Sequence, residues 1–216
     1  YRGCEHGCKY CYAIYSHDYL DNNNFFDTVY YKNKHQLLQA LESELANPNW
    51  KKDIINIGGV CDAYQPIEKE LEIMPEVIKL MIKYTTPIII STKSNLVLRD
   101  IELLNELSKI TYVNIACTIT TMDESIRKEI EPNACSSLDR FKVLKEFKER
   151  TNCSIGVHLM PIIPYLTDDY KNLREIYRLS SNIRVNYVLP GTMYLIGKTK
   201  PYFFDFIKQY NLEKYN

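Results

Sequence analysis

The sequence lacks a charge excess of either sign, a long apolar run, and any repeat or low-complexity stretch. Lysine plus arginine and aspartate plus glutamate both number 27, so the formal net charge is zero. A globally basic nucleic-acid-binding surface is therefore not indicated, although a local basic face is compatible with this balance. No apolar run reaches the roughly 20 residues that a membrane-spanning helix needs, so we expect no membrane partner.

The chain also has no evident interdomain linker and no need of covalent staples. A sequence of 216 residues is the size of one domain and can bury about 70% of its unfolded surface. We therefore predict a single domain over residues 1–216. The seven cysteines are odd in number and unevenly spread, which favours a reducing, cytoplasmic location over a secreted disulfide framework.

Three of the cysteines are concentrated in one short stretch. Cys4, Cys8 and Cys11 form the pattern C-x3-C-x2-C. Three close thiolates can hold three irons of a [4Fe-4S] cluster, and without a fourth cysteine the last iron keeps an open site. Two other interpretations stay open for so short a motif: a structural zinc site completed by His6 or Cys61, and disulfide bonds.

Short apolar segments rich in β-branched residues recur along the chain and predict strands. Segments with helical periodicity separate them, and this alternation is typical of parallel β/α units. The expected strands lie near residues 55, 89, 115, 158 and 186, and the expected helices span 35–46, 75–84, 101–107, 123–130, 137–150, 168–180 and 201–210.

The first residues suggest one more strand. Tyr1-Arg2-Gly3 has the character of a strand end that turns into the segment with Cys4, Cys8 and Cys11, which we call the cysteine loop. With that strand the count of expected strands reaches six. We expect the chain to lack most of this first strand, and further sequence to follow Asn216.

Residues that could bind a ligand or take part in a reaction recur where the expected strands end. Besides the cysteine loop, these are Gly58-Gly59, Lys93, Thr118 and the region of Pro161. Functional groups of parallel β/α barrels collect at the C-terminal ends of the strands. The sequence therefore predicts an active site at this edge of the sheet.

The cysteine motif, with Tyr10 directly before its third cysteine, resembles that of the radical S-adenosylmethionine superfamily. The resemblance implies that the three thiolates hold a [4Fe-4S] cluster whose unique iron chelates S-adenosylmethionine. It also implies cleavage to a 5′-deoxyadenosyl radical, driven by a one-electron reductant such as flavodoxin or ferredoxin. The fold it implies is α/β, a partial (β/α)6 TIM-like barrel, here lacking its first strand.

Further segments narrow the resemblance to the group related to spore photoproduct lyase, the DNA repair photolyase-like enzymes. The matches follow one another over nearly the whole chain and imply a lyase-like reaction with nucleic acid as a candidate substrate. They are residues 62–68 (DAYQPIE), 92–94 (TKS), 98–104 (LRDIELL), 118–121 (TITT), 131–132 with Arg140, and 161–164 (PIIP).

The resemblance assigns cofactor contacts to five residues. Gly58 and Gly59 offer backbone to the amino group of S-adenosylmethionine, and Tyr10 lies beside the cluster. Lys93 and Thr118 contact the carboxylate and the ribose, as an ammonium and a hydroxyl group can. The alternatives are a simple strand-end turn for the glycines and a solvated or salt-bridged lysine.

Two residues are candidates for hydrogen-atom transfer. For this transfer the related lyases use a cysteine near the end of the strand that we expect near residue 55. Gly59 aligns with that cysteine, and Cys61 stands where relatives carry serine or threonine. Tyr12 resembles a tyrosine of their hydrogen-return path, and packing beside the cluster is its alternative role.

Other polar residues have structural interpretations. We expect His158 to be a hydrogen-bonded core histidine, Glu131 and Arg140 to form an ion pair at the barrel rim, and Arg99 and Asp100 to pair and to cap the following helix.

Two rival functions remain beside the lyase-like one. The first is radical modification of a peptide, a tRNA or a small molecule. The second, of another class, is a zinc-binding structural module.

Overall fold

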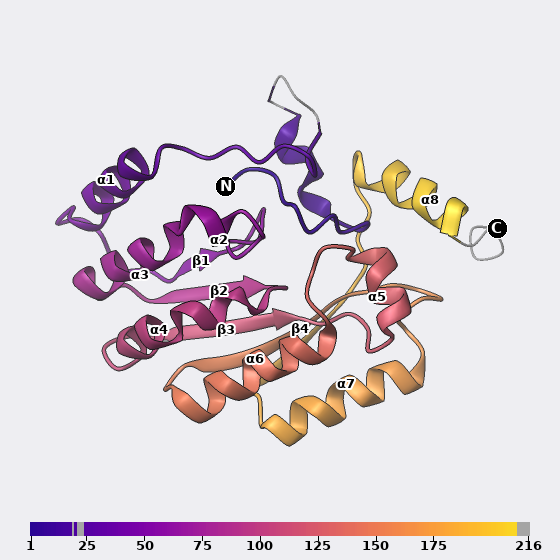
Figure 1. Ribbon diagram of the computed structural model, residues 1–216. Helices are drawn as coiled ribbons and strands as arrows, with labels where there is room; N and C mark the ends of the chain where they lie inside the picture. Colours follow the sequence, from indigo (N-terminus) through magenta and orange to yellow (C-terminus); the bar gives the residue numbers. More distant parts are fainter. Residues whose placement is uncertain (19, 21–23, 211–216) are drawn as a thin grey trace.

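The computed structural model describes residues 1–18, 20 and 24–210. Within them, one sheet of five strands follows the order of the chain, β1-β2-β3-β4-β5 (Figure 1). All four neighbouring pairs are parallel, so every connection is a crossover. The strands are β1 (Ile55–Ile57), β2 (Ile88–Thr92), β3 (Val113–Thr118), β4 (Ser154–Ile162) and β5 (Tyr187–Thr192).

Helices supply the crossovers, as the alternating pattern predicts. The described helices are α1 (Lys34–Leu45), α2 (Glu68–Leu71), α3 (Ile73–Tyr84), α4 (Ile101–Ser108), α5 (Glu124–Ile130), α6 (Ser137–Arg150), α7 (Tyr170–Ile183) and α8 (Thr199–Tyr210), with 3-10 helices η1 (Tyr12–His17) and η2 (Asn95–Asp100). The short α2 is missing from the sequence prediction, because four residues carry no periodicity. No helix of the described residues is both long and apolar enough to cross a membrane.

The N-terminal segment does not join the sheet. Arg2 instead forms a single antiparallel bridge with Tyr30, through backbone hydrogen bonds of 2.9 and 2.7 Å. The described residues thus supply five of the six expected strands, the set of a partial barrel without its first strand.

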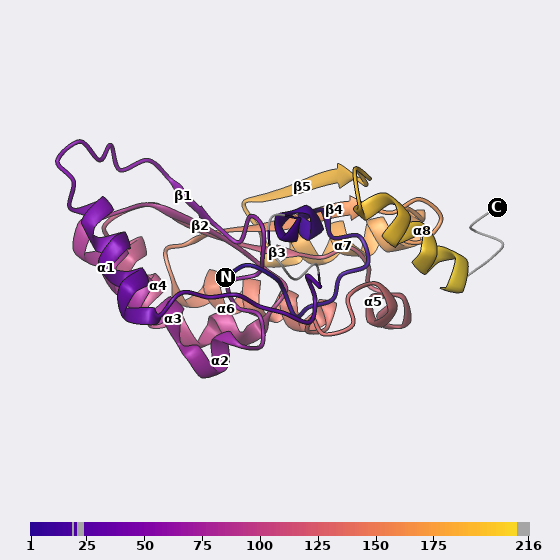
Figure 2. The same ribbon diagram turned by 90° about the horizontal axis from the view of Figure 1, so that it is seen from above.

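The two faces of the sheet differ in character. Helices α2–α4 and α6 lie on one side of it (Figure 2), and residues such as Ile90, Ile115 and Val157 are fully buried in the core there. Successive side chains of a strand point to opposite faces, so Ser91 and His158, next in sequence, point the other way. Both line a cavity on that second face. The packing of the helices therefore leaves a polar face free for function.

Close packing between β4 and β5 depends on one glycine. Gly156 pairs with Tyr187 in the parallel register. A β-carbon on Gly156 would lie 2.1 Å from the Tyr187 ring, well inside van der Waals contact. The phenol ring can lie across this strand only because position 156 has no side chain.

We expect Gly156→Ala to destabilise the protein by about 1–3 kcal/mol, because the added methyl group must displace the Tyr187 ring. Gly59→Ala is the matched control, since no heavy atom lies within 4 Å of its added β-carbon. Urea unfolding of both variants checks this. Equal stability of the two would contradict the close packing of Tyr187.

Candidate active site

A cavity of about 500 Å³ lies at the C-terminal ends of the strands, within the range typical of small-molecule sites. The N-terminal segment crosses this end of the sheet (Figure 1). All ten residues assigned to the site from the sequence line this one cavity: Cys4, Cys8, Tyr10, Cys11, Tyr12, Gly58, Gly59, Cys61, Lys93 and Thr118. The fold thereby brings together residues that are up to 114 positions apart in the sequence, from Cys4 to Thr118.

Asp62 fastens one side of the cysteine loop. Its buried carboxylate is hydrogen-bonded to His6 Nε2 of the loop at 3.0 Å. It also accepts hydrogen bonds from the Thr92 hydroxyl at 2.8 Å and the Lys93 backbone N–H at 2.7 Å, both at the end of β2. Burial opposes ionisation, but His6 and the Lys93 N–H outweigh it and lower the pKa of Asp62 to about 2. The carboxylate thus stays charged and ties the loop to the strand end.

Glu131 fastens the other side of the loop. The Tyr10 hydroxyl donates to this fully buried carboxylate, and the Thr120 hydroxyl donates at 3.2 Å. Arg140, reaching in from α6, pairs with it at 2.6 Å. Although burial alone would raise the pKa of Glu131, the charges of Arg140 and Lys93 hold it below its ordinary value. The predicted Glu131–Arg140 ion pair is confirmed, and it also positions a residue of the cavity wall.

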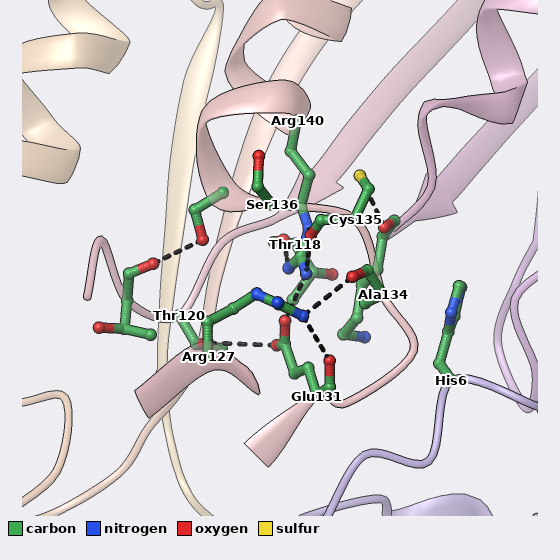
Figure 3. Close-up of polar contacts among 12 residues, drawn as sticks. His6, Thr118, Thr120, Arg127, Glu131, Ala134, Cys135, Ser136 and Arg140 are labelled. Carbon is green, nitrogen blue, oxygen red and sulfur yellow. Dashed lines mark hydrogen bonds and ion pairs between the residues drawn. The ribbon is translucent and has the colours of Figure 1, made fainter. Parts of the chain in front are cut away.

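Arginine side chains also organise the turn after α5. Figure 3 shows Arg127 and Arg140 converging around Glu131. Arg127 donates to the backbone oxygens of Glu131 and Ala134 at 2.7 and 2.9 Å, and Arg140 donates to the carbonyls of Thr118 and Cys135 at 2.8 and 2.7 Å. These bonds satisfy carbonyl groups at the end of a helix and a strand, where the regular pattern leaves them unpaired.

The three cysteines of the loop suit iron–sulfur ligation. All are free thiols, and burial, aided by neighbouring negative groups, raises the pKa of each to about 12. Without a bound cation they stay protonated, whereas a coordinated metal deprotonates a thiol outright. In the described residues, no three His, Cys, Asp or Glu side chains are placed to hold one metal ion. A single zinc ion needs such convergence, but in a [4Fe-4S] cluster each thiolate binds a different iron.

Lys93 brings a positive charge to the cavity wall. Its Nζ lies 5.8 Å from the centroid of the Tyr10 ring and has no ion-pair partner among the described residues. Burial opposes its charge, yet Cys8, Glu131 and Asp62 together raise the pKa of Lys93 above its ordinary value. The ammonium group thus remains charged and available to an anionic ligand.

The two glycines after β1 differ from each other. Gly58 has φ = +101°, and a β-carbon there would lie 2.5 Å from the Ser91 carbonyl oxygen, so its conformation requires glycine. Nothing within 4 Å would meet a β-carbon on Gly59, and its carbonyl accepts a hydrogen bond from the Tyr12 hydroxyl. The turn itself explains Gly58, whereas Gly59 leaves open space in the cavity.

Cys61 and Tyr12 both face the cavity. The Cys61 thiol is half-buried and donates to the Tyr1 carbonyl at 3.3 Å. Burial raises its pKa, so the thiol keeps its hydrogen atom. Tyr12 is 52% exposed, and its phenol lies over the strand-end turn at Gly59 rather than packing in the core.

Some expectations from the sequence need correction. His158 is half-buried and lines the cavity instead of lying in the core. Arg99 pairs with Asp100 at 2.9 Å as expected, but the Asp100 side chain makes no capping hydrogen bond to α4 because Arg99 and Tyr64 occupy it.

The sequence analysis missed several residues of the cavity wall. They include Asn56, Ser91, Met160 and Tyr194. The alternation of side chains along β1, β2 and β4 is a signal that could have found the first three.

Fold and site together define a parallel β/α protein with a cysteine-lined cavity at its strand ends. The family model described as the radical SAM superfamily matches residues 1–193. The chain therefore belongs to the radical S-adenosylmethionine superfamily.

Relatives from distant organisms match nearly the whole chain. An uncharacterised protein of Methanocaldococcus jannaschii is 30% identical over 211 residues, which cover 96% of this chain and 68% of the relative. An uncharacterised protein of Mycobacterium tuberculosis is 28% identical over 207 residues, 94% of this chain. The chain spans 60% of the length of this mycobacterial relative.

Solved structures share the fold at low sequence identity. Spore photoproduct lyase in complex with the dinucleoside spore photoproduct superposes with a TM-score of 0.68 and 13% identity, over 98% of this chain and 59% of the lyase. SuiB of Streptococcus suis bound to S-adenosylmethionine gives a TM-score of 0.62 and 14% identity, over 97% of this chain and 46% of SuiB. The chain thus has the partial TIM-barrel fold of radical S-adenosylmethionine proteins, the fold that spore photoproduct lyase also has.

We expect Arg140→Met to cost about 3–5 kcal/mol of unfolding free energy, because it leaves the Glu131 carboxylate buried without its charge partner. Arg150→Met is the matched control: Arg150 pairs with Glu146 at 3.2 Å on the exposed surface, and its loss should change stability little. Urea unfolding measures both. A small effect at Arg140 would show that Glu131 does not need this partner.

Proposed function

We propose that this protein is a radical S-adenosylmethionine enzyme in which Cys4, Cys8 and Cys11 hold a [4Fe-4S] cluster. The observation that carries the proposal is the convergence of all ten predicted site residues on one cavity at the strand ends. When bound, the cluster and S-adenosylmethionine supply a 5′-deoxyadenosyl radical that abstracts a hydrogen atom.

Residues of this chain bind and orient S-adenosylmethionine beside the three cysteines. The Lys93 ammonium pairs with its carboxylate, and the Thr118 hydroxyl bonds to its ribose. The backbone at Gly58 and Gly59 receives its amino group, for which Gly59 leaves room. Tyr10, fixed by Glu131, closes the cavity around the cysteines and excludes water.

Cys61 is the candidate donor of a hydrogen atom to the substrate, and Tyr12 is the second. Both line the cavity, and both carry S–H or O–H bonds, since their pKa values are raised by burial. An external one-electron donor such as flavodoxin or ferredoxin would supply the electron that cleavage of S-adenosylmethionine requires.

For the substrate we propose a nucleic acid, in a lyase-like reaction. Spore photoproduct lyase, whose fold this chain shares, is solved with a dinucleoside spore photoproduct. In this chain Tyr12 and Tyr194 line the cavity and are 52% and 75% exposed, and exposed aromatic rings can stack on bases. The zero net charge does not contribute to this argument.

A peptide that the enzyme would modify is the second candidate substrate. SuiB, another structural neighbour with a TM-score of 0.59, is solved with its precursor peptide SuiA. Salt-sensitive binding of single-stranded DNA would favour nucleic acid, and its absence would favour the peptide.

We expect Cys8→Ala to abolish cluster binding and S-adenosylmethionine cleavage after anaerobic reconstitution with iron and sulfide. Cys153→Ala is the matched control: Cys153 is a buried cysteine outside the cavity that contacts the Leu104 carbonyl, so this variant should load iron like the unmodified protein. Iron and sulfide contents, the visible spectrum and 5′-deoxyadenosine formation are measured. Tightly bound zinc, with no cluster, would overturn the proposed function.

We expect Lys93→Met to weaken S-adenosylmethionine binding about 10- to 100-fold while leaving the iron content unchanged, because loss of a buried charge-assisted bond costs about 1.5–3 kcal/mol. Lys9→Met, a change on the cysteine loop outside the cavity, is the control. Equilibrium binding to the reconstituted protein checks this. Unchanged affinity would assign Lys93 to structure alone.

A further inference from the structure

His158 occupies a wall of the cavity to which nothing above assigns a function. It lies on β4, opposite Thr118 of β3 and Leu189 of β5 in the parallel register. The side chain is half-buried and lines the cavity on the polar face of the sheet. An imidazole there is placed to contact a molecule inside the cavity.

A chain of hydrogen bonds behind His158 favours one tautomer of its imidazole. Asn114 donates its amide N–H to the Ser154 hydroxyl at 3.0 Å, which turns its amide oxygen toward Tyr187. The Tyr187 hydroxyl donates to that oxygen at 2.8 Å and lies 3.3 Å from His158 Nε2. Because a phenol has only one proton to donate, the Tyr187 oxygen can only accept from Nε2–H.

The other ring nitrogen of His158 is therefore an acceptor. In the neutral imidazole one nitrogen carries the proton and the other a lone pair, so protonation of Nε2 leaves the lone pair on Nδ1. Nδ1 has no hydrogen-bond partner among the described residues. Burial and the Lys93 charge lower the pKa of His158, which keeps the ring neutral at pH 7.

This chain of hydrogen bonds is part of the packing of the sheet. Tyr187 reaches Asn114 and His158 because Gly156 leaves room for its ring. Asn114 is buried and lies on β3, one strand away from β4 and two from β5. Three adjacent strands thus hold the imidazole in one tautomer.

We propose that His158 is a substrate-recognition residue, which presents Nδ1 as a fixed acceptor to a neutral N–H or O–H donor of the substrate. A neutral donor fits better than an ammonium group, because Lys93 places a positive charge in the same cavity. This inference rests on the proposed function in taking the cavity as the substrate site. Asn114 and Tyr187 are then positioning residues, since they act through the imidazole.

The first test needs neither cluster nor activity, so it fails separately from the proposed function. Nitrogen-15 NMR of histidine side chains is recorded on the apoprotein at neutral pH, and His158→Gln assigns the signal among the four histidines. The expected result is one neutral species with the proton on Nε2, and a mixture of tautomers in Tyr187→Phe. A proton on Nδ1, or a doubly protonated ring, would overturn the proposal.

The second test asks what Nδ1 binds. The labelled apoprotein is titrated with thymidine and 3-methylthymidine, and with N-methylacetamide and N,N-dimethylacetamide, pairs that differ only by one N–H. The Nδ1 signal should move with the N–H member of a pair and not with its methylated partner. The pair that responds distinguishes a ring imide from an open amide. Equal responses within each pair, or none at all, would overturn the proposal.

The third test separates the substrate from the cofactor. His158→Gln keeps an amide near the Nε2 position, whereas His158→Asn keeps an acceptor near the Nδ1 position. The probe response should vanish in the first variant and be partly retained in the second. Both should bind S-adenosylmethionine like the unmodified protein after reconstitution. A tenfold loss of cofactor affinity, about 1.4 kcal/mol, would assign His158 to the cofactor instead.

Discussion

Two buried carboxylates, Asp62 and Glu131, fix where the cysteine loop lies. A charge removed from water is stable only with a full set of partners, and for each carboxylate those partners come from both the loop and the sheet. Asp62 needs His6 together with the end of β2, and Glu131 needs Tyr10 together with Arg140. Neither carboxylate is satisfied unless the loop is docked, so their burial makes the geometry of the three thiols part of the fold.

The same constraint sets the electrostatics of the cavity. The two carboxylates and the thiol region surround Lys93 and keep it charged, although no oxygen of the described residues pairs with its Nζ. A charged group held in place without a direct partner is suited to bind an anion, because the protein has already met the cost of burying it. Helices α2–α4 and α6 contribute by covering the opposite face of the sheet (Figure 2), so the polar face is left to the cavity.

The matching structures place these features in a wider group. Spore photoproduct lyase and SuiB share this fold at 13% and 14% identity, so the barrel tolerates nearly complete replacement of its sequence. Function then depends on the residues of the cavity rather than on the fold itself. His158, held by Tyr187 and Asn114, is one such residue on the wall formed by the later strands, away from the cysteine loop.

The sequence by itself determined the order of strands and helices and the cysteine motif, and its resemblance to the superfamily named ten residues that line one cavity. Local periodicity predicts the strands and helices, short spacing defines the cysteine motif, and the other site residues follow from the resemblance to the superfamily. Only the tertiary structure decided which polar residues face one another. Asp62 meets Thr92 across 30 residues, and Glu131 meets Tyr10 across 121. That His158 of β4 faces the cavity follows only from the packing of the sheet, which decides which of its faces the helices cover. Such relations depend on three-dimensional packing, which no local pattern in the chain encodes.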